Sequence, residues 1–268
     1  MQKLNSVKGT KDIFGKTALE HDYVLKTFKD VCVFNNFKKI STPILEHENV
    51  FVKTLGVSSD IISKEMYHFK DQGGDDLVLR PEGTAAIVRA LITNSLQDDI
   101  NKNFYYYGPM FRRERPQSGR LRQFHQVGLE VFGDRNFLDD VRIIILAEKF
   151  LGKLKIRNKL KLQINTLGDP KNRKRYITEL QKFLKSNFSK LSSESKKKIE
   201  INPLRILDSK DEGDKKLFSN SPQIIDFLDS DSKEFFQEIK KMLINLDIKF
   251  DVNPFLVRGL DYYNHTAF

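Results

Sequence analysis

Two strand-like patterns with an arginine-rich loop between them, within residues 105–132, constrain the fold of this chain more than any other stretch. Residues 104–111 are aromatic and apolar, and residues 123–132 alternate in polarity. The loop is polar and contains Pro and Gly, which predicts an antiparallel hairpin with a long connection. One face of the second strand carries Val127, Leu129 and Val131. The other face does not have the pattern of a buried core face, because it carries Phe124, Gln126, Gly128 and Glu130.

The loop of this hairpin is rich in arginine, although the chain as a whole prefers lysine. Of the 46 basic residues only 14 are arginine, yet residues 103–148 contain no lysine. The loop holds one acid, Glu114, and five arginines: Arg112, Arg113, Arg115, Arg120 and Arg122. Because a guanidinium is a planar, always charged fork that binds carboxylate or phosphate, this pattern predicts an anion site. The alternative is a solvated hairpin with a salt-bridged tip.

A second candidate site lies where a predicted strand, residues 77–80, runs through Arg80-Pro81-Glu82-Gly83-Thr84 into a predicted helix, residues 85–96. Pro and Gly fix a bend there, so the Glu82 carboxylate is held near a helix N-terminus with the Thr84 hydroxyl two residues on. Two interpretations remain open. Thr84 is a helix N-cap in a structural turn, or Glu82 binds an ammonium group.

The remaining patterns predict a mixture of helices and strands, and we expect an α+β fold. Apolar spacing predicts a helix over residues 17–36, a strand over 37–46 interrupted at Pro43, a polar turn over 60–65 and a strand over 66–69. A helix over 136–155 and a strand over 160–165 follow. Asp169-Pro170 begins a Lys-rich helical segment that extends to about residue 250, with connecting turns at 189–198 and 202–214. Residues 253–268 return to a strand pattern.

Composition predicts a soluble, cytoplasmic protein. No apolar run approaches 18 residues, and the N-terminus lacks the apolar stretch of a signal peptide, so we expect no membrane partner. The single cysteine, Cys32, excludes an internal disulfide. The formal net charge is +10, and residues 151–216 alone carry an excess of 11 positive charges. A polyanion partner and a solvated lysine-rich surface explain that excess equally well.

Several longer motifs occur along the chain: KGTKDIF at 8–14, FKKISTPILE at 37–46, RPEGT at 80–84, GPMFRRERPQSGRLRQFHQVGLEVFG at 108–133, NPLRILDSK at 202–210 and LVRGLDYY at 256–263. In these motifs, from Gly9 onward, the chain resembles the histidyl-tRNA synthetase family, a class II aminoacyl-tRNA synthetase family. The resemblance implies a class II antiparallel sheet flanked by helices. It also implies a homodimer, with the proline of the 37–46 segment at the interface.

The resemblance also implies the role of each site residue. Arg112 and Arg258 would be catalytic. The histidine-binding residues would be Glu82, Thr84, Arg112, Gln126, Glu130, Arg258, Tyr262 and Tyr263. ATP, with Mg²⁺ as part of the substrate complex, would contact Arg112, Glu114, Arg120 and Phe124. Gln117 would reach the acceptor end of tRNA(His). No protein-bound structural metal is expected.

The resemblance further implies three segments: residues 1–168 as the first part of the catalytic core, 169–252 as a helical basic insertion, and 253–268 as a return strand. The third class II motif and the anticodon-binding domain do not occur in this sequence. We therefore expect a catalytic fragment that binds histidine and ATP weakly and has little adenylation activity on its own. Two rival interpretations are a non-catalytic regulatory subunit of ATP phosphoribosyltransferase and a general RNA-binding module.

Overall fold

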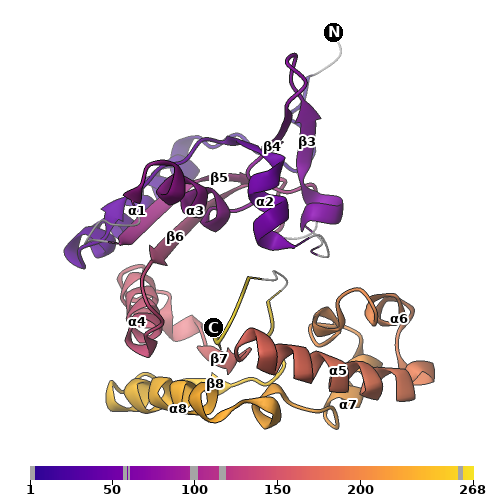
Figure 1. Cartoon of the computed structure of the whole chain (residues 1–268). Coiled ribbons are helices and arrows are strands. Elements are labelled where there is room, and N and C mark those ends of the chain that lie inside the picture. Colours follow the sequence, from indigo (N-terminus) through magenta and orange to yellow (C-terminus); the bar gives the residue numbers. More distant parts are fainter. Residues whose placement is uncertain (1–3, 57–58, 60, 97–101, 115–118, 259–261) are drawn as a thin grey trace. The chain divides into compact units, whose positions relative to one another are not determined.

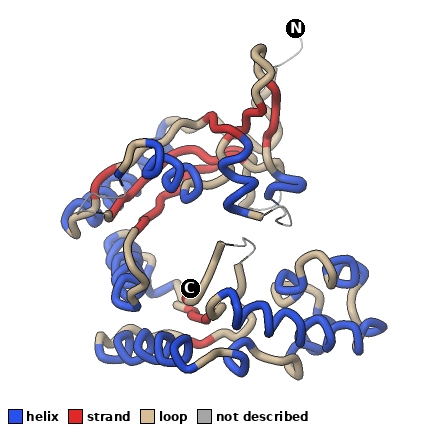
Figure 2. The backbone as a smooth tube through the Cα atoms, in the orientation of Figure 1, coloured by secondary structure: helices blue, strands red, loops and turns tan. Residues whose placement is uncertain are grey.

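The computed structural model describes residues 4–56, 59, 61–96, 102–114, 119–258 and 262–268. In these ranges helices combine with three small sheets, which confirms the predicted α+β class (Figures 1 and 2). The chain divides into two compact units, Met1–Asp134 with Leu146–Ile156, and Arg135–Ile145 with Arg157–Phe268. Helix α4 (Phe137–Lys153) contributes to both units. The segment boundaries expected at residues 168 and 252 stay a prediction.

The first unit carries the hairpin and the elements that pack on it. In chain order its elements are α1 (Gly15–Phe34), β1 (Lys38–Lys39), β2 (Leu45–His47), α2 (Glu48–Leu55), a π-helix (Ile61–Glu65), β3 (Tyr67–Lys70), β4 (Asp76–Leu79), α3 (Thr84–Thr93), β5 (Asn103–Phe111) and β6 (Gln123–Val131). One sheet has the order β1-β5-β6, and a second has the order β2-β4-β3. The pair β5–β6 is antiparallel along its whole length, so the predicted hairpin is confirmed. In contrast, β1 pairs with β5 in parallel.

Helix α1 packs on the β5–β6 face that carries the odd-numbered side chains. Its buried residues Thr27, Phe28, Val31 and Cys32 recur at helical spacing and form one buried stripe, which is apolar apart from the Thr27 hydroxyl. The Phe28 ring meets Tyr105 of β5 edge to face, with 6.1 Å between ring centroids. Helix α3 packs on the opposite face, where Ile87 and Leu91 join the core of Phe104, Tyr106 and Met110. The face with Gln126 and Glu130 therefore lies on the α3 side of the sheet.

The second unit is mainly helical around a small sheet of order β8-β7-β9. With the first half of α4, its elements are a 3₁₀ turn (Arg157–Lys159), β7 (Gln163–Thr166), α5 (Pro170–Ser186), a 3₁₀ turn (Phe188–Lys190), α6 (Ser193–Lys198), a 3₁₀ turn (Pro203–Ile206), α7 (Glu212–Phe218), a 3₁₀ turn (Ile224–Phe227), α8 (Ser230–Asn245), β8 (Asp251–Val252) and β9 (Thr266–Ala267). Helix α5 buries Tyr176, Leu180 and Leu184, one residue per turn, in a core that also contains Leu191 and Ile199 on either side of α6 and Phe218 of α7. A second core joins α4, β7 and α8.

Helix α5 begins as its sequence predicts. The Asp169 side chain accepts a hydrogen bond from the Asn172 amide at 2.6 Å, and Pro170 occupies the first helical position. The side-chain amide of Asn172 donates to Oδ2 of Asp229 at 3.0 Å, and Asp229 is the N-cap residue of α8. The N-termini of α5 and α8 are therefore fastened together inside this unit.

Three predicted segments differ from the structure. Residues 61–65 form the π-helix rather than a plain turn, and α6 occupies the second half of the expected connecting turn at 189–198. Of the expected final strand at 253–268, only Thr266–Ala267 is a strand among the described residues. The side-chain amide of Asn165 donates to the carbonyls of Pro254 and Leu256, which replaces the backbone ladder there. No helix in the described part of the chain is long and apolar enough to cross a membrane.

Candidate active site

The β5–β6 register places the predicted site residues of the hairpin on one face. Phe124, Gln126 and Glu130 lie opposite Met110, Gly108 and Phe104, respectively, and alternation directs all three to the α3 side. The opposite face belongs to α1, where the rings of His125 and His21 meet at 5.0 Å. Burial lowers the pKa of His125, and the neighbouring His21 lowers it further. The polar face is thus separate from the α1 side of the sheet.

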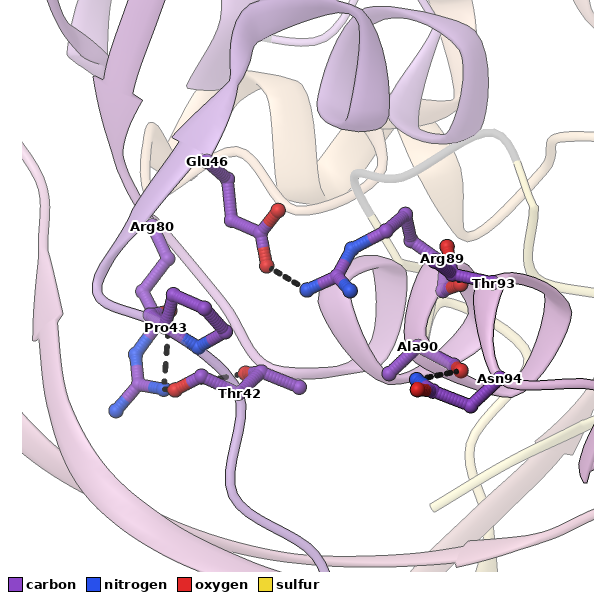
Figure 3. Close-up of polar contacts among 8 residues, drawn as sticks. All are labelled: Thr42, Pro43, Glu46, Arg80, Arg89, Ala90, Thr93 and Asn94. Atoms are coloured by element: carbon purple, nitrogen blue, oxygen red, sulfur yellow. Dashed lines mark hydrogen bonds and ion pairs between the residues drawn. The ribbon is translucent and has the colours of Figure 1, made fainter.

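Arg80 fixes the turn that leads from β4 into α3. Its side chain is 6% exposed, and its Nε donates to the Pro109 carbonyl at 3.0 Å. Its Nη1 donates to the Thr42 carbonyl at 2.8 Å, beside Pro43 (Figure 3). Burial lowers the pKa of Arg80, and its contacts to carbonyl oxygens make it a brace between chain segments. The bend before Glu82 is therefore held from β5 and from the segment before β2.

Helix α3 is also held by an ion pair. Glu46 of β2, which is 6% exposed, accepts a hydrogen bond from Arg89 Nη2 in the middle of α3 (Figure 3). A buried carboxylate without its cation would be strongly destabilising, so this pair fixes α3 against β2. Arg80 before the turn and Arg89 within α3 therefore hold the N-terminus of α3, where the predicted site residues lie, from both sides.

Glu82 caps helix α3. Its Oε2 accepts from the Thr84 amide and its Oε1 accepts from the Ala85 amide, both at 2.7 Å. A carboxylate satisfies these otherwise unpaired amides and complements the positive end of the helix dipole. Of the two open interpretations, the Thr84 N-cap is wrong, because Gly83 is at the N-cap position, Thr84 is the first helical residue and the Glu82 carboxylate accepts from the amides of the first turn. Burial raises the pKa of Glu82, against the opposing effect of these amides and of Arg112.

Thr84 joins α3 to the hairpin. Its hydroxyl donates to Glu130 Oε1 at 2.7 Å, although 46 residues separate the two in sequence. Burial raises the pKa of Glu130 to about 7, the Thr84 hydrogen bond opposes that rise, and the charge of Glu82 adds to it. Near neutral pH the Glu130 carboxyl group therefore exists in both protonation states, so it can donate or accept a hydrogen bond.

Gln126 supplies an acceptor without a partner. Its Oε1 is buried, and no hydrogen-bond partner for it exists among the described residues. Such a group normally costs free energy, so buried side-chain oxygens are almost always paired in a folded protein. On the same face lies Glu130, and Glu82 precedes the helix that packs there. A ligand with N–H groups would satisfy this acceptor.

Arg112 lies at the edge of the same face. Its Nε donates to the Pro81 carbonyl at 2.9 Å, and its guanidinium lies over the Phe124 ring with 5.3 Å from Cζ to the centroid. Two of the residues predicted to contact ATP are therefore adjacent. The other two, Glu114 and Arg120, form an ion pair at 2.7 Å whose arginine side chain is 58% exposed. For that pair alone, the alternative of a salt-bridged loop describes the structure well. Gln117 lies outside the described residues.

Arg258, Tyr262 and Tyr263 belong to the second unit. The Arg258 guanidinium lies 5.8 Å from the Tyr263 ring centroid, and the rings of Tyr262 and Tyr263 stack at 4.8 Å. Arg258 Nη2 also donates to the carbonyl of Phe268, and Arg173 Nη1 donates to that of Tyr263. The predicted residues of this segment are thus brought together with one another, within their own unit.

One group in the described residues has the spacing of metal ligands. Glu48, His68 and Asp76 place one ligand atom each within 4.8 Å of the others. The three side chains are partly exposed, by 35–45%, and the Lys70 ammonium lies 3.0 Å from Asp76 Oδ1. Because the lysine already neutralises that carboxylate, we assign no metal ion to this group.

Comparison with known proteins agrees with this arrangement of motifs. A profile of the family Histidyl-tRNA synthetase matches residues 9–268. The histidine–tRNA ligase of Rhodospirillum rubrum is 46% identical over the whole of this chain, which covers 65% of that protein. The corresponding protein of Pediococcus pentosaceus is 46% identical over 99% of this chain and 63% of its own length.

The chain belongs to the histidyl-tRNA synthetase family.

Solved structures agree with this membership. The apo structure of S. aureus histidyl-tRNA synthetase aligns with a TM-score of 0.75 and 33% identity, over 98% of this chain and 60% of that one. A Bacillus halodurans protein described as an ATP phosphoribosyltransferase regulatory subunit/histidyl-tRNA synthetase aligns with a TM-score of 0.64 at 19% identity, which shows a common fold alone. The chain spans 61–65% of the length of curated family members that it matches.

Two residues in this part of the family fold were not predicted as site residues from the sequence. Arg80 is the brace described above, and Tyr106 lies on the site face of β5 with 6% of its surface exposed. A signal for Tyr106 was present in the sequence, because Gly128 interrupts the second strand pattern. Glycine inside a strand marks a place where another group approaches the backbone closely.

Proposed function

We propose that this chain carries the amino-acid-activating site of a histidine–tRNA ligase, which joins histidine to ATP as histidyl-adenylate and then transfers it to tRNA(His). The observation that carries the proposal is the buried Gln126 Oε1, which lies on the same face as Glu130 and has no hydrogen-bond partner in the described part of the chain. Together with Glu82 they present acceptor oxygens to a ligand that brings N–H donors. Histidine brings an α-ammonium group and an imidazole.

Each group of the substrate has a proposed partner. Glu82, Thr84 and Gln126 would surround the α-ammonium, and Glu130 with Tyr263 would bind the imidazole, beside Tyr262. The raised pKa of Glu130, about 7, suits this role because its carboxyl group can donate to or accept from an imidazole nitrogen. An amino acid that lacks the ring nitrogens would leave these groups unpaired, which disfavours its binding.

The chemistry requires charge and position rather than a protein nucleophile. A carboxylate oxygen of histidine attacks the α-phosphorus of ATP, a new P–O bond forms, and the bond to the pyrophosphate leaving group breaks. Arg112 would hold the α-phosphate, and Arg258 would bridge it to the histidine carboxylate, so that two anions are held together. Glu114 and Arg120 would lie near the Mg²⁺-bound triphosphate, and Phe124 would stack on adenine.

The partners of the proposed enzyme are histidine, ATP and tRNA(His), with Gln117 reaching the acceptor end of the tRNA. We also propose a homodimer formed through the Pro43 segment. Exposed apolar side chains on α1, such as Leu19 and Phe34, at 71% and 84% exposure, support a further interface on the first unit.

The test is calorimetric titration of this chain with L-histidine, together with histidine-dependent ATP–pyrophosphate exchange. We expect histidine binding that weakens at least tenfold in Glu130→Ala, and no binding of leucine. In a full-length context, Arg258→Ala should slow exchange about 10²-fold, because one oriented charge contributes about 3 kcal/mol in the transition state. Absence of histidine binding, or unchanged binding in Glu130→Ala, would contradict the proposal.

The rival function, a regulatory subunit without catalysis, predicts histidine binding but no exchange at any ATP concentration. Measured in a full-length context, the exchange assay separates the two, and measured on this chain alone it tests the expectation that its adenylation is slow. The intact arginine set of the hairpin favours the enzyme, because a regulator has no need for groups that hold a triphosphate. A general RNA-binding module explains neither Glu82 nor Glu130.

A further inference from the structure

The tip of the Tyr106 ring is confined between two glycines. A methyl group added to Gly83 would lie 2.3 Å from Cε2 and Cζ of this ring, and one added to Gly128 would lie 2.3 Å from Cε1 and Cζ. Neither glycine has a positive φ, so neither is needed for its backbone conformation. Both positions therefore require glycine for space, since no side chain fits between the backbone and the ring.

The β5–β6 register shows what the ring separates. Gly128 is the direct partner of Tyr106, and Gln126 and Glu130 lie two residues to either side of Gly128 on the same face. Across the ring, Gly83 lies between Glu82 and Thr84. The ring therefore lies between the helix-capping turn and the middle of β6, with a proposed ligand group on each side of both glycines.

A second contact also joins the turn before α3 to β6. The Thr84 hydroxyl donates to Glu130 Oε1 at 2.7 Å, so the turn and β6 are joined there by a hydrogen bond. A hydrogen bond prevents the two segments from separating, and the Tyr106 ring prevents them from moving together. An aromatic ring is suited to this task because it is rigid and has only two side-chain torsions.

We infer that Tyr106 is a positioning residue that fixes the separation between Glu82 and Glu130, and with it the length of the amino acid that the site accepts. The inference rests on the proposed function. The ammonium and the ring of histidine are joined by two carbon atoms, so their two binding groups must keep one fixed separation. A displacement of about 1 Å at such a site costs up to about 10²-fold.

The experiment is a double-mutant cycle of Tyr106→Leu and Gly128→Ala in this chain, with histidine and ATP affinities measured by calorimetry. Each single variant should weaken histidine binding about tenfold or more and leave ATP binding within about twofold. Because the added methyl acts through the ring, Gly128→Ala should have almost no further effect in the Tyr106→Leu background. Tyr106→Phe keeps the ring and should restore histidine affinity to within about threefold.

Tyr107→Leu is the matched control. Tyr107 is the next residue of β5 on the opposite face, where its hydroxyl accepts a hydrogen bond from Lys39 at 3.0 Å, and its loss should leave histidine affinity unchanged. If Tyr106→Leu does not fold, Tyr106→Met, whose unbranched and flexible side chain adapts better to an irregular space, replaces it in the cycle with the same expectations.

Three results would overturn the inference: unchanged histidine affinity in the Tyr106 variants, equal losses of histidine and ATP affinity, or additive effects of the two substitutions. In each of these the parent chain still binds histidine, so the proposed function survives. A parent chain that binds no histidine would overturn both.

Discussion

Two buried polar clusters, one in each unit, are built from similar groups but are satisfied very differently. In the first unit, Gln126 Oε1 has no partner among the described residues, and burial raises the pKa of Glu130 to about 7. In the second unit, the fully buried Asp214 accepts hydrogen bonds from the Ser192 amide at 2.9 Å and from three hydroxyls, of Ser192, Ser195 and Ser209, at 2.6–2.8 Å. Burial alone would raise the pKa of Asp214, yet these hydrogen bonds together hold it below its usual value.

The difference separates a structural carboxylate from a functional one. A carboxylate has about four acceptor sites, and Asp214 fills them with four hydrogen bonds from its own unit, so it contributes to the fold and keeps no capacity for a ligand. Glu82 accepts two such bonds and keeps acceptor sites for a ligand. A buried acceptor without a partner costs stability, and it persists where a ligand supplies the missing donor. We therefore expect substitutions in the Asp214 cluster to change stability, and substitutions on the hairpin face to change binding.

The largest expected effect is on the Asp214 cluster. Asp214→Ala should destabilise the second unit by about 3–5 kcal/mol, because the serine donors that surround the carboxylate lose their acceptor in a buried site. Urea unfolding and hydrogen exchange of peptides over residues 192–214 would measure the loss. Glu212→Gln, an exposed neighbour in the same helix, is the control and should be nearly silent. A loss below about 1 kcal/mol for Asp214→Ala would break the comparison.

Glu130 should make stability depend on pH in the sense opposite to Asp214. A carboxyl group whose pKa is raised in the folded state, here to about 7 from 4.5, binds more protons folded than unfolded between these values. Its contribution to stability is therefore present below about pH 4.5 and is lost as the pH rises to about 7. In the parent chain this loss lowers the free energy of unfolding by up to about 3 kcal/mol, and Glu130→Gln should abolish it. Urea unfolding at several pH values from 4.5 to 8 measures this free energy for both proteins.

The control for this pH series is Glu20→Gln on α1, a glutamate with a 61% exposed side chain that should leave the slope intact. Asp214 gives the opposite slope, because its stabilisation is lost as the pH falls through its lowered pKa. Equal slopes for the parent chain and Glu130→Gln would show that Glu130 is an ordinary carboxylate.

Gln126→Leu should separate binding from stability. Removing an unpaired acceptor from a buried position costs little, so the free energy of unfolding should change by less than about 1 kcal/mol or increase. Histidine affinity should fall about tenfold to hundredfold, because the ammonium group loses an acceptor. Calorimetry and urea unfolding on the same preparation measure both quantities. A large loss of stability with unchanged affinity would reverse the assignment of this residue.

The smallest expected effect is on the ion pair of Glu114 and Arg120, whose side chains are 16% and 58% exposed, respectively. Glu114→Gln should change the free energy of unfolding by at most about 0.5 kcal/mol, because an ion pair with an exposed partner contributes little and the glutamine keeps the shape of the side chain. Its consequence should appear in ATP affinity instead. Thermal unfolding and nucleotide titration test this, and a stability loss above about 1 kcal/mol would make the pair structural.

Elements that depend on residues close in sequence, such as β6 and the start of α5, could be predicted from the sequence. The alternation of residues 123–132 predicted β6 and its polar face, and Asp169-Pro170 predicted the start of α5. Helix α6 escaped prediction because the Ser- and Lys-rich sequence of 189–198 has the composition of a turn. The start of α6 is held by Asp214, which accepts hydrogen bonds from Ser192 and Ser195 although it lies 22 residues after Ser192. Such a partner cannot be identified from a local pattern.

Part of the candidate site could also be predicted from local patterns. Glu82, Gln126 and Glu130 stood out as candidates because they are polar residues within or next to segments whose pattern is otherwise apolar. The capping of α3 by Glu82 rather than Thr84 depends on how the turn is folded, and composition does not determine that. The contacts of the Tyr106 ring with Gly83 and Gly128 join three segments that are far apart in sequence, so they could be identified only in the folded structure.

The most direct test of the functional assignment is a ¹³C NMR titration of the Glu130 carboxyl group, with and without saturating L-histidine. The account predicts a pKa of about 7 in the free chain. Histidine should lower it by about one unit or more, since a bound ligand that carries a positive charge and N–H donors favours the carboxylate. An exposed glutamate such as Glu20 should not respond. A pKa near 4.5 in the free chain, or a raised pKa that histidine leaves unchanged, would contradict the assignment of this face to the amino acid.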